Sequence, residues 1–252
     1  MKKYKISTFL QLAMLLFFIG GCEHSSNIKF SDIYILIDVT DKDFKDQTII
    51  LESVPKILKK MNVDPTRADM SGGEVKIFTI NDLSETKSLT VRLNQGVEGL
   101  LGQNPLDRQD EIKKFQSDLS SKISELLKDN DWNKEKSKIY QNVCRELNNL
   151  KKADTKHSKT MILFSDMLEN STLLSFYKSN TDVLINQIES FEKNTLSKDC
   201  AIPDLSEIEF YVVTNRNKTN DELINKAERF WKALFKLKNV KHFSFDAELH
   251  LD

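Results

Sequence analysis

Short apolar runs alternate with longer amphipathic stretches along the chain. The runs are rich in Ile, Val and Phe, which is typical of buried strands, whereas the longer stretches carry apolar residues three and four positions apart, which is typical of helices with one buried face. The predicted strands span residues 33–38, 74–80, 88–93, 159–165, 208–214 and 240–245. The predicted helices span residues 47–61, 107–128, 134–152, 173–191 and 221–237. Because strands alternate with helices, the pattern predicts an α/β fold with a doubly wound, mostly parallel central sheet flanked by helices on both faces.

Two features of this pattern leave alternatives open. The strands 74–80 and 88–93 are separated by a short polar segment, so they form either a simple hairpin or an edge at which a parallel strand is followed by an antiparallel one. Pro55 lies inside the helix 47–61, which predicts a helix start or a kink near it. A further interruption is expected near Asn180.

Acidic and hydroxyl side chains gather where two of the predicted strands end. The first strand ends in Asp38 and is followed by Thr40, while the strand 159–165 is followed by Asp166 and the helix before it opens with Ser137. In open parallel sheets ligands bind at the carboxyl edge, so these side chains converge there if the two strands are neighbours. Their oxygens suit a hard divalent cation. The structural alternative is that each acid caps the following turn or helix.

These residues resemble the metal-ion-dependent adhesion site of a von Willebrand factor type A (VWA) domain, and the resemblance covers roughly residues 32–245. That site consists of an Asp-x-Ser-x-Ser stretch, a later threonine and a later aspartate. By this resemblance Asp38 and Thr40 match the first aspartate and first serine, Ser137 matches the threonine, and Asp166 matches the last aspartate. The resemblance implies a Rossmann-like, VWA-type fold and a non-catalytic protein. Its site would bind Mg²⁺ or Mn²⁺ with an open position for a carboxylate of a partner protein.

The chain departs from the VWA pattern at two positions. Lys42 occupies the place of the second serine, where its ammonium could replace the cation electrostatically or lie in solvent while Asp41 contributes to the site. Met167 replaces the glycine that usually follows the last aspartate. The region before the central strand is rich in serine, so Ser124 is an alternative to Ser137. The competing hypothesis is a vestigial site that holds no metal.

The first residues of the chain predict export. Three lysines within the first five residues precede an apolar run at 6–19, which is shorter than the roughly 20 residues of a membrane span. The stretch 19–22, Ile-Gly-Gly-Cys, resembles the lipobox of bacterial lipoproteins, which implies an S-diacylated Cys22 as the first residue of the mature chain. The domain would then be lipid-anchored in the bacterial cell envelope, outside the cytoplasm, with the choice of membrane left open. The predicted division is a signal peptide at 1–21, a lipidated tether at 22–31 and a VWA-like domain at 32–252.

Composition and motifs argue against several functions. The chain has 37 lysines and arginines and 38 aspartates and glutamates, for a formal net charge of −1, so no global field favours nucleic acid. No GxSxG, P-loop or GxGxxG motif occurs. The Asp-x-Asp-x-Thr pattern of haloacid dehalogenase-like phosphatases is not met, because Asp41 comes one position late. We therefore expect no enzyme activity.

Cys144 and Cys200 are the two cysteines beyond the predicted lipidation site. In an exported protein they could form a disulfide. Cys144, however, lies between Val143 and Leu147 on the apolar face of a predicted helix. This position favours a buried free thiol.

A metal-free alternative makes the domain a structural or scaffold lipoprotein of an envelope assembly. Its loops at 62–73 or 96–105 would then contact a protein partner without a cation. Phe176, Tyr177 and Trp132 are candidate exposed aromatic contacts, although each of them is also explained as a packing residue.

Overall fold

The computed structural model describes residues 28–81, 86–97, 102–128, 130, 137–215 and 221–251. Six strands form one sheet in the order β3-β2-β1-β4-β5-β6. All pairings are parallel except that of β2 with β3. The strands are β1 (Phe30–Asp38), β2 (Gly72–Ile80), β3 (Ser88–Leu93), β4 (Ser158–Phe164), β5 (Ile208–Val213) and β6 (His242–Asp246). This doubly wound order confirms the predicted fold class. The consecutive strands β2 and β3 pair as a hairpin, and β3 is the antiparallel edge of an otherwise parallel sheet, so the two alternatives for this pair describe the same arrangement.

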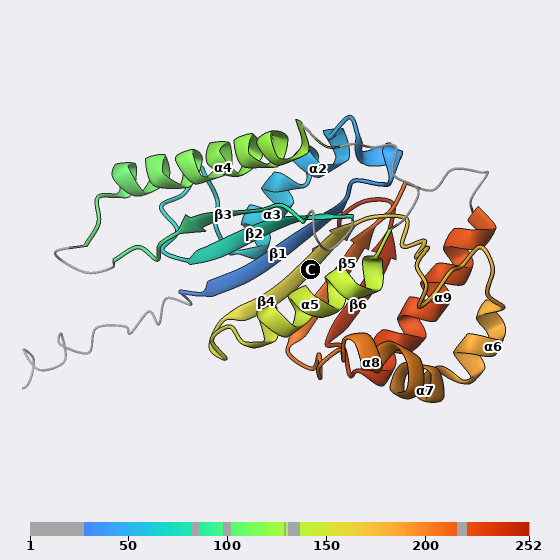
Figure 1. The fold of residues 1–252 in the computed structure, drawn as a ribbon. Coiled ribbons are helices and arrows are strands. Elements are labelled where there is room, and N and C mark those ends of the chain that lie inside the picture. The colour runs from blue at the N-terminus through green and yellow to red at the C-terminus, as the bar shows by residue number, and fades with distance from the viewer. Residues whose placement is uncertain are drawn as a thin grey trace, which may run out of the picture.

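Helices cover both faces of the sheet, as Figure 1 shows, with α2, α3 and α4 on one side and α5 and α9 on the other. The α-helices are α2 (Thr48–Glu52), α3 (Val54–Lys60), α4 (Pro105–Lys128), α5 (Ile139–Lys151), α6 (Thr181–Asn186), α7 (Ile188–Phe191), α8 (Ser197–Asp199) and α9 (Asp221–Leu237). A 3-10 turn at Lys42–Phe44 and a π-helical turn at Glu192–Leu196 complete the described helical segments. In the described part of the chain, no helix combines the length and the apolar character that a membrane span requires.

The strand β1 separates two hydrophobic cores. Its side chains alternate, so that Tyr34 and Leu36 join the core under α5 and α9 while Ile35 and Ile37 join the core under α3 and α4. Burial on both faces explains why this strand is a continuous apolar run. Both cores lie within residues 33–249, so the chain from residue 28 onward contains the packing that the fold requires.

The structure differs from the predicted helices in two places. The predicted helix 47–61 is divided into α2 and α3 at Ser53, with Pro55 in the first turn of α3, where a missing N–H costs no hydrogen bond. The predicted helix 173–191 is wrong over its first half, because α6 begins only at Thr181 after the N-cap Asn180. The apolar residues before it are buried in turns, so their helix-like spacing reflects core packing without a helix.

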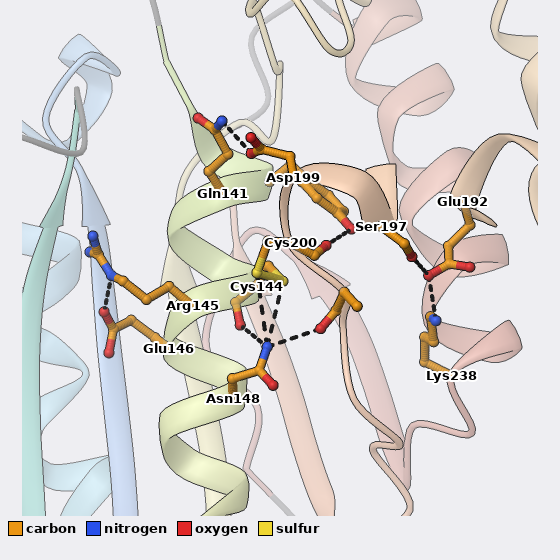
Figure 2. Close-up of a disulfide and its surroundings, with 12 residues drawn as sticks. Gln141, Cys144, Arg145, Glu146, Asn148, Glu192, Ser197, Asp199, Cys200 and Lys238 are labelled. Atoms are coloured by element: carbon orange, nitrogen blue, oxygen red, sulfur yellow. Dashed lines mark hydrogen bonds and ion pairs between the residues drawn. A yellow bond between two sulfur atoms is a disulfide. The ribbon is translucent and has the colours of Figure 1, made fainter. Parts of the chain in front are cut away.

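A disulfide joins Cys144 of α5 to Cys200, which follows α8. The predicted free thiol is therefore wrong. Cys144 is fully buried as expected, but the segment after α8 crosses the same face of α5 and places Cys200 beside it (Figure 2). Asn148 holds this crossing by donating Nδ2–H bonds to the carbonyls of Cys144 and Ala201, each at 3.0 Å. In the chain-entropy account, closing a loop of this length stabilises the fold by about 4 kcal/mol.

Candidate functional site

The predicted site residues meet at the carboxyl edge of the sheet, because β1 and β4 are parallel neighbours. Asp38 is the last residue of β1, Asp166 follows the end of β4, and Ser137 lies just before α5. The serine does not open the helix itself, since α5 begins at Ile139. The alternative Ser124 lies within α4 on the opposite face of the sheet.

Asp38 is the centre of a buried hydrogen-bond network. Its Oδ1 accepts from the backbone N–H of Thr40 at 2.9 Å and from the Thr40 hydroxyl at 2.6 Å. Its Oδ2 accepts from the hydroxyls of Ser137 at 3.1 Å and Ser165 at 2.9 Å. The carboxylate is only 1% exposed. Asp38, Thr40 and Ser137 are thus brought together as predicted, and Ser165 is an additional member whose only sequence signal is its place beside Asp166.

Asp166 joins the network through Asp41. The Asp166 backbone N–H donates to Asp41 Oδ2 at 3.0 Å, while Asp41 Oδ1 accepts from the backbone N–H of Asp43 at 3.1 Å. Asp166 also accepts from the backbone N–H of Leu168 at 2.8 Å, so it caps the turn that follows β4, as the structural alternative requires. Lys42 is exposed. Of the two roles considered for this position, the structure therefore agrees with a solvent-exposed lysine beside a contributing Asp41.

A pocket of about 380 Å³ opens over this network. It is lined by Thr40, Asp41, Ser137, Asp166, Leu168, Asn170 and Tyr177. No lysine or arginine is among the described residues that line it. Tyr177 is 56% exposed at the pocket, as a contact residue would be, whereas Phe176 is buried at 3% and belongs to the core. Trp132 lies outside the described residues.

Burial raises the pKa of Asp38, Asp41 and Asp166, and repulsion from neighbouring carboxylates raises it further at Asp41 and Asp166. The pKa of Asp38 is raised by burial, against the hydrogen bonds from Thr40, Ser165 and Ser137. Burial, and then the nearby Asp38 carboxylate, raise the pKa of Asp41 to about 7. Burial, and then Asp41 and Asp38, raise the pKa of Asp166 to about 8. The site therefore gathers three carboxyl groups whose charged forms are disfavoured, with no basic side chain in the pocket lining, and an added cation would lower all three pKa values.

Glu169 supports the site from behind and was not predicted. This fully buried carboxylate accepts from the Tyr140 backbone N–H at 2.7 Å, so it satisfies a free donor at the start of α5. Burial raises its pKa to about 7. Its neighbour Asn170 donates a backbone N–H bond to the Ser137 carbonyl at 3.4 Å. The loop after β4 therefore positions Ser137, through contacts between residues that are distant in sequence.

The turn after Asp166 has the backbone that glycine adopts easily. Met167 has a φ of 60°, in the left-handed region that side chains disfavour. Its N–H donates to the Ser165 hydroxyl at 2.9 Å, and its carbonyl accepts from the Trp231 indole N–H at 3.0 Å. The Met167 side chain is completely buried. These contacts offset the strain of the left-handed backbone at Met167. The turn is therefore kept although methionine replaces the glycine of the VWA pattern.

The donor atoms of the site fit a hard cation in chemistry and charge. Carboxylate and hydroxyl oxygens are the ligands of Mg²⁺ and Mn²⁺. Within the described ranges, no three His, Cys, Asp or Glu side chains lie close enough to hold a metal by themselves. A cation at this edge would therefore need the hydroxyls of Thr40 and Ser137 together with the carboxylates.

Comparisons with known proteins concern the fold. The sequence matches no protein-family model and no curated protein. Among solved structures, it is similar to the SpRpn10 VWA domain, with 13% identity, a TM-score of 0.38, and coverage of 78% of this chain and 82% of that one. It is also similar to BatB from Bacteroides thetaiotaomicron, with 8% identity, a TM-score of 0.39, and coverage of 86% of this chain and 90% of that one.

A third solved structure is an aerotolerance-related membrane protein from Bacteroides fragilis, with 8% identity, a TM-score of 0.37, and coverage of 87% of this chain and 92% of that one. At such identities the likeness is one of fold and says nothing about what this chain binds. The chain has a doubly wound, mostly parallel α/β fold, with Asp38, Ser137 and Asp166 at the carboxyl edge of the sheet, where the sequence resemblance to a VWA domain places them.

Proposed function

We propose that this domain is a non-catalytic binding module that recognises a protein partner through the pocket at the carboxyl edge. Asp38, Thr40, Ser137 and Asp166 would hold a Mg²⁺ or Mn²⁺ ion there, with Asp41 contributing. The ion would supply an electrophilic position for a carboxylate of the partner. The observation that supports the proposal most strongly is the hydrogen bonding of Asp38. Its two carboxylate oxygens accept hydrogen bonds from hydroxyls of three separate segments, and the pocket above them is lined by Asp41 and Asp166.

The proposed lipid anchor suits this orientation. β1 enters the sheet at the amino edge and reaches the site after nine residues, which is a distance of roughly 30 Å. A chain anchored at Cys22 would therefore present the pocket on the side away from the membrane. The disulfide agrees with export, because such bonds persist in oxidising compartments. The lipobox itself lies outside the described residues.

Thermal unfolding tests the cation directly. We expect millimolar Mg²⁺ or Mn²⁺ to raise the melting temperature of the domain from residue 28 onward and a chelator to reverse the shift, because an ion bound only by the folded state stabilises it. The Asp38→Ala variant should lose the shift. Asp64→Ala is the matched control, because Asp64 forms the same kind of turn at an exposed position. An unchanged melting temperature in the unsubstituted domain would contradict metal binding.

One observation favours a metal-free scaffold as the second candidate. Both oxygens of Asp38 already accept two hydrogen bonds each, so the network is closed without an ion. In that case the pocket would bind its partner through Tyr177 and its polar rim. Capture of the partner from solubilised membranes, with and without chelator, separates the two candidates. Capture that survives the chelator but fails in a Tyr177→Ala variant would support the scaffold.

A further inference from the structure

A second cluster of charged and aromatic side chains lies at the amino edge of the sheet, opposite the candidate site. Phe30 begins β1, His157 directly precedes β4, and Arg92 pairs with Glu74 near the end of the antiparallel β3. Lys152 and Lys156 lie in the connection between α5 and β4, and Lys29 precedes β1. We call these residues the amino-edge patch: Lys29, Phe30, Arg92, Lys152, Lys156 and His157.

The patch is built around a half-buried aromatic ring. The rings of Phe30 and His157 lie 4.4 Å apart, and the Arg92 guanidinium lies 5.4 Å from the centre of the Phe30 ring. His157 Nδ1 is 2.8 Å from Asp32 Oδ2, which fixes the orientation of the imidazole. Phe30, Arg92, Lys152 and His157 line an open pocket of about 310 Å³, together with the acids Asp32, Glu74 and Asp154. An apolar ring bordered by cations is the arrangement that amphipathic side chains adopt at a lipid–water interface.

The exposed charged residues of the amino-edge patch are basic. The acids Asp32 and Glu74 are engaged within the structure, Asp32 by His157 and Glu74 by Lys76 at 3.0 Å and by Arg92 at 3.7 Å. The side chain of Arg92 is nevertheless 60% exposed. Lys29, Lys152 and Lys156 are also exposed, against one exposed acid, Asp154, in the described connection between α5 and β4. The opposite edge carries the carboxyl groups of Asp38, Asp41 and Asp166 and no lysine or arginine among the described residues that line its pocket.

The chain itself brings this edge close to a membrane. Six residue steps separate Cys22 from residue 28, and even a fully extended chain of that length spans no more than roughly 20 Å. If Cys22 carries the proposed lipid, the edge at which β1 begins faces the bilayer at that distance.

We propose that the amino-edge patch docks onto the anionic headgroups of the membrane that holds the chain. Its lysines and Arg92 contact lipid phosphates, and the Phe30 ring lies at the headgroup level. The docking orients the domain with the candidate site facing outward. This contact rests on the proposed lipid anchor, but it does not depend on a cation at the opposite edge.

Vesicle flotation with the domain from residue 28 onward tests the patch without the lipid anchor. We expect binding to phosphatidylcholine vesicles that contain phosphatidylglycerol, weakening at high salt, and little binding to phosphatidylcholine alone. Lys152→Glu combined with Lys156→Glu should weaken binding by roughly 25-fold or more, at about fivefold for each removed base. The same charge change placed elsewhere, Lys113→Glu with Lys232→Glu, should leave most of the binding intact because these exposed lysines lie on α4 and α9.

Two results would overturn the docking proposal. Equal binding to neutral and anionic vesicles would exclude recognition of anionic headgroups. An equal loss in the two double variants would show that only net charge matters and that the patch has no special role. Arg92→Gln provides a milder second variant that keeps a polar side chain over Phe30, and it should weaken binding severalfold. The melting temperature of each variant reports whether it is folded, and none of these outcomes depends on metal binding.

Discussion

Two turns of this molecule have the same local geometry and opposite electrostatics. In Asp38-Val39-Thr40, the first carboxylate accepts from the backbone N–H and the hydroxyl of Thr40 at 2.9 and 2.6 Å. In Asp64-Pro65-Thr66, the carboxylate accepts from the same groups of Thr66 at 2.7 and 2.6 Å. Yet the pKa of Asp38 is raised and that of Asp64 is lowered.

Burial explains the difference. The hydrogen bonds from Thr66 favour the charged form of the exposed Asp64 and lower its pKa. The same bonds at Asp38 are outweighed by the cost of burying the charge. The Asp-x-Thr turn is therefore a local motif that many loops can form. It becomes a candidate binding site only where the fold adds buried hydroxyls and further acids around it.

The largest expected contrast between the two turns is in the pH dependence of stability. Asp166, beside the buried turn, has a pKa raised from 3.8 to about 8, so the folded state retains a proton that the unfolded chain releases. The stabilisation of the folded state by this retained proton is complete below about pH 4 and is lost as the pH rises through 8. The free energy of unfolding then falls by up to roughly 1.4 kcal/mol per pH unit. Asp64 has a lowered pKa, so its contribution is present above about pH 4 and is lost only as the pH falls below that value.

Urea unfolding of the chelator-treated domain from pH 4 to 9 measures this contrast. Asp166→Asn should flatten the fall in stability between pH 4 and 8, whereas Asp64→Asn should leave that range unchanged and alter only the acid limb. A flat profile in the unsubstituted domain would show that the buried acids do not hold a proton, and the raised pKa of Asp166 would then be wrong.

An effect of intermediate size is expected when the threonine of each turn, Thr40 or Thr66, is replaced and the Mn²⁺ affinity is measured. Thr40→Val removes the hydroxyl that donates to Asp38 and keeps the side-chain shape, so we expect Mn²⁺ affinity to fall by roughly tenfold or more, as for other groups that hold a metal ligand. Thr66→Val removes the equivalent hydroxyl from the exposed turn and should leave the affinity unchanged. Isothermal titration calorimetry gives both values. Equal effects of the two substitutions would mean that the turn at Asp38 has no special role.

The smallest expected effect is a change in Mn²⁺ affinity when Lys42, in the turn after Asp38, is replaced. Lys42→Ser restores the second serine of the VWA pattern and removes a positive charge next to Asp41, so Mn²⁺ affinity should rise by about two- to fivefold, as expected for an exposed charge in water. Lys45→Ser removes a similarly exposed charge from the same loop and serves as the control. An increase that is equal in both variants would be purely electrostatic and would show that position 42 supplies no ligand.

Local pattern was sufficient to predict the fold class and the strand ends that carry the candidate site residues. The apolar runs that end at Asp38 and before Asp166 locate two strand ends, but that these strands are neighbours is shown only by the structure. The direct bond from Ser137 to Asp38 could be expected only through the VWA resemblance, because 99 residues separate the two side chains.

Contacts between segments that are distant in the sequence were not predictable from local pattern. Glu169 meets Tyr140 across 29 residues, and Cys200 meets Cys144 across 56. Neither pairing leaves a periodic trace in the sequence, since each depends on where a loop passes over α5. The helix predicted from residue 173 fails for a related reason: Leu174 and Phe176 are buried by packing against the core while their backbone forms turns.

The most direct test of the candidate site is a calorimetric Mn²⁺ titration of the metal-free domain. Our account predicts that one ion binds per chain, that Asp38→Ala abolishes this binding, and that Asp64→Ala retains it. Absence of binding at millimolar Mn²⁺, or binding that persists unchanged in Asp38→Ala, would contradict a cation site centred on Asp38.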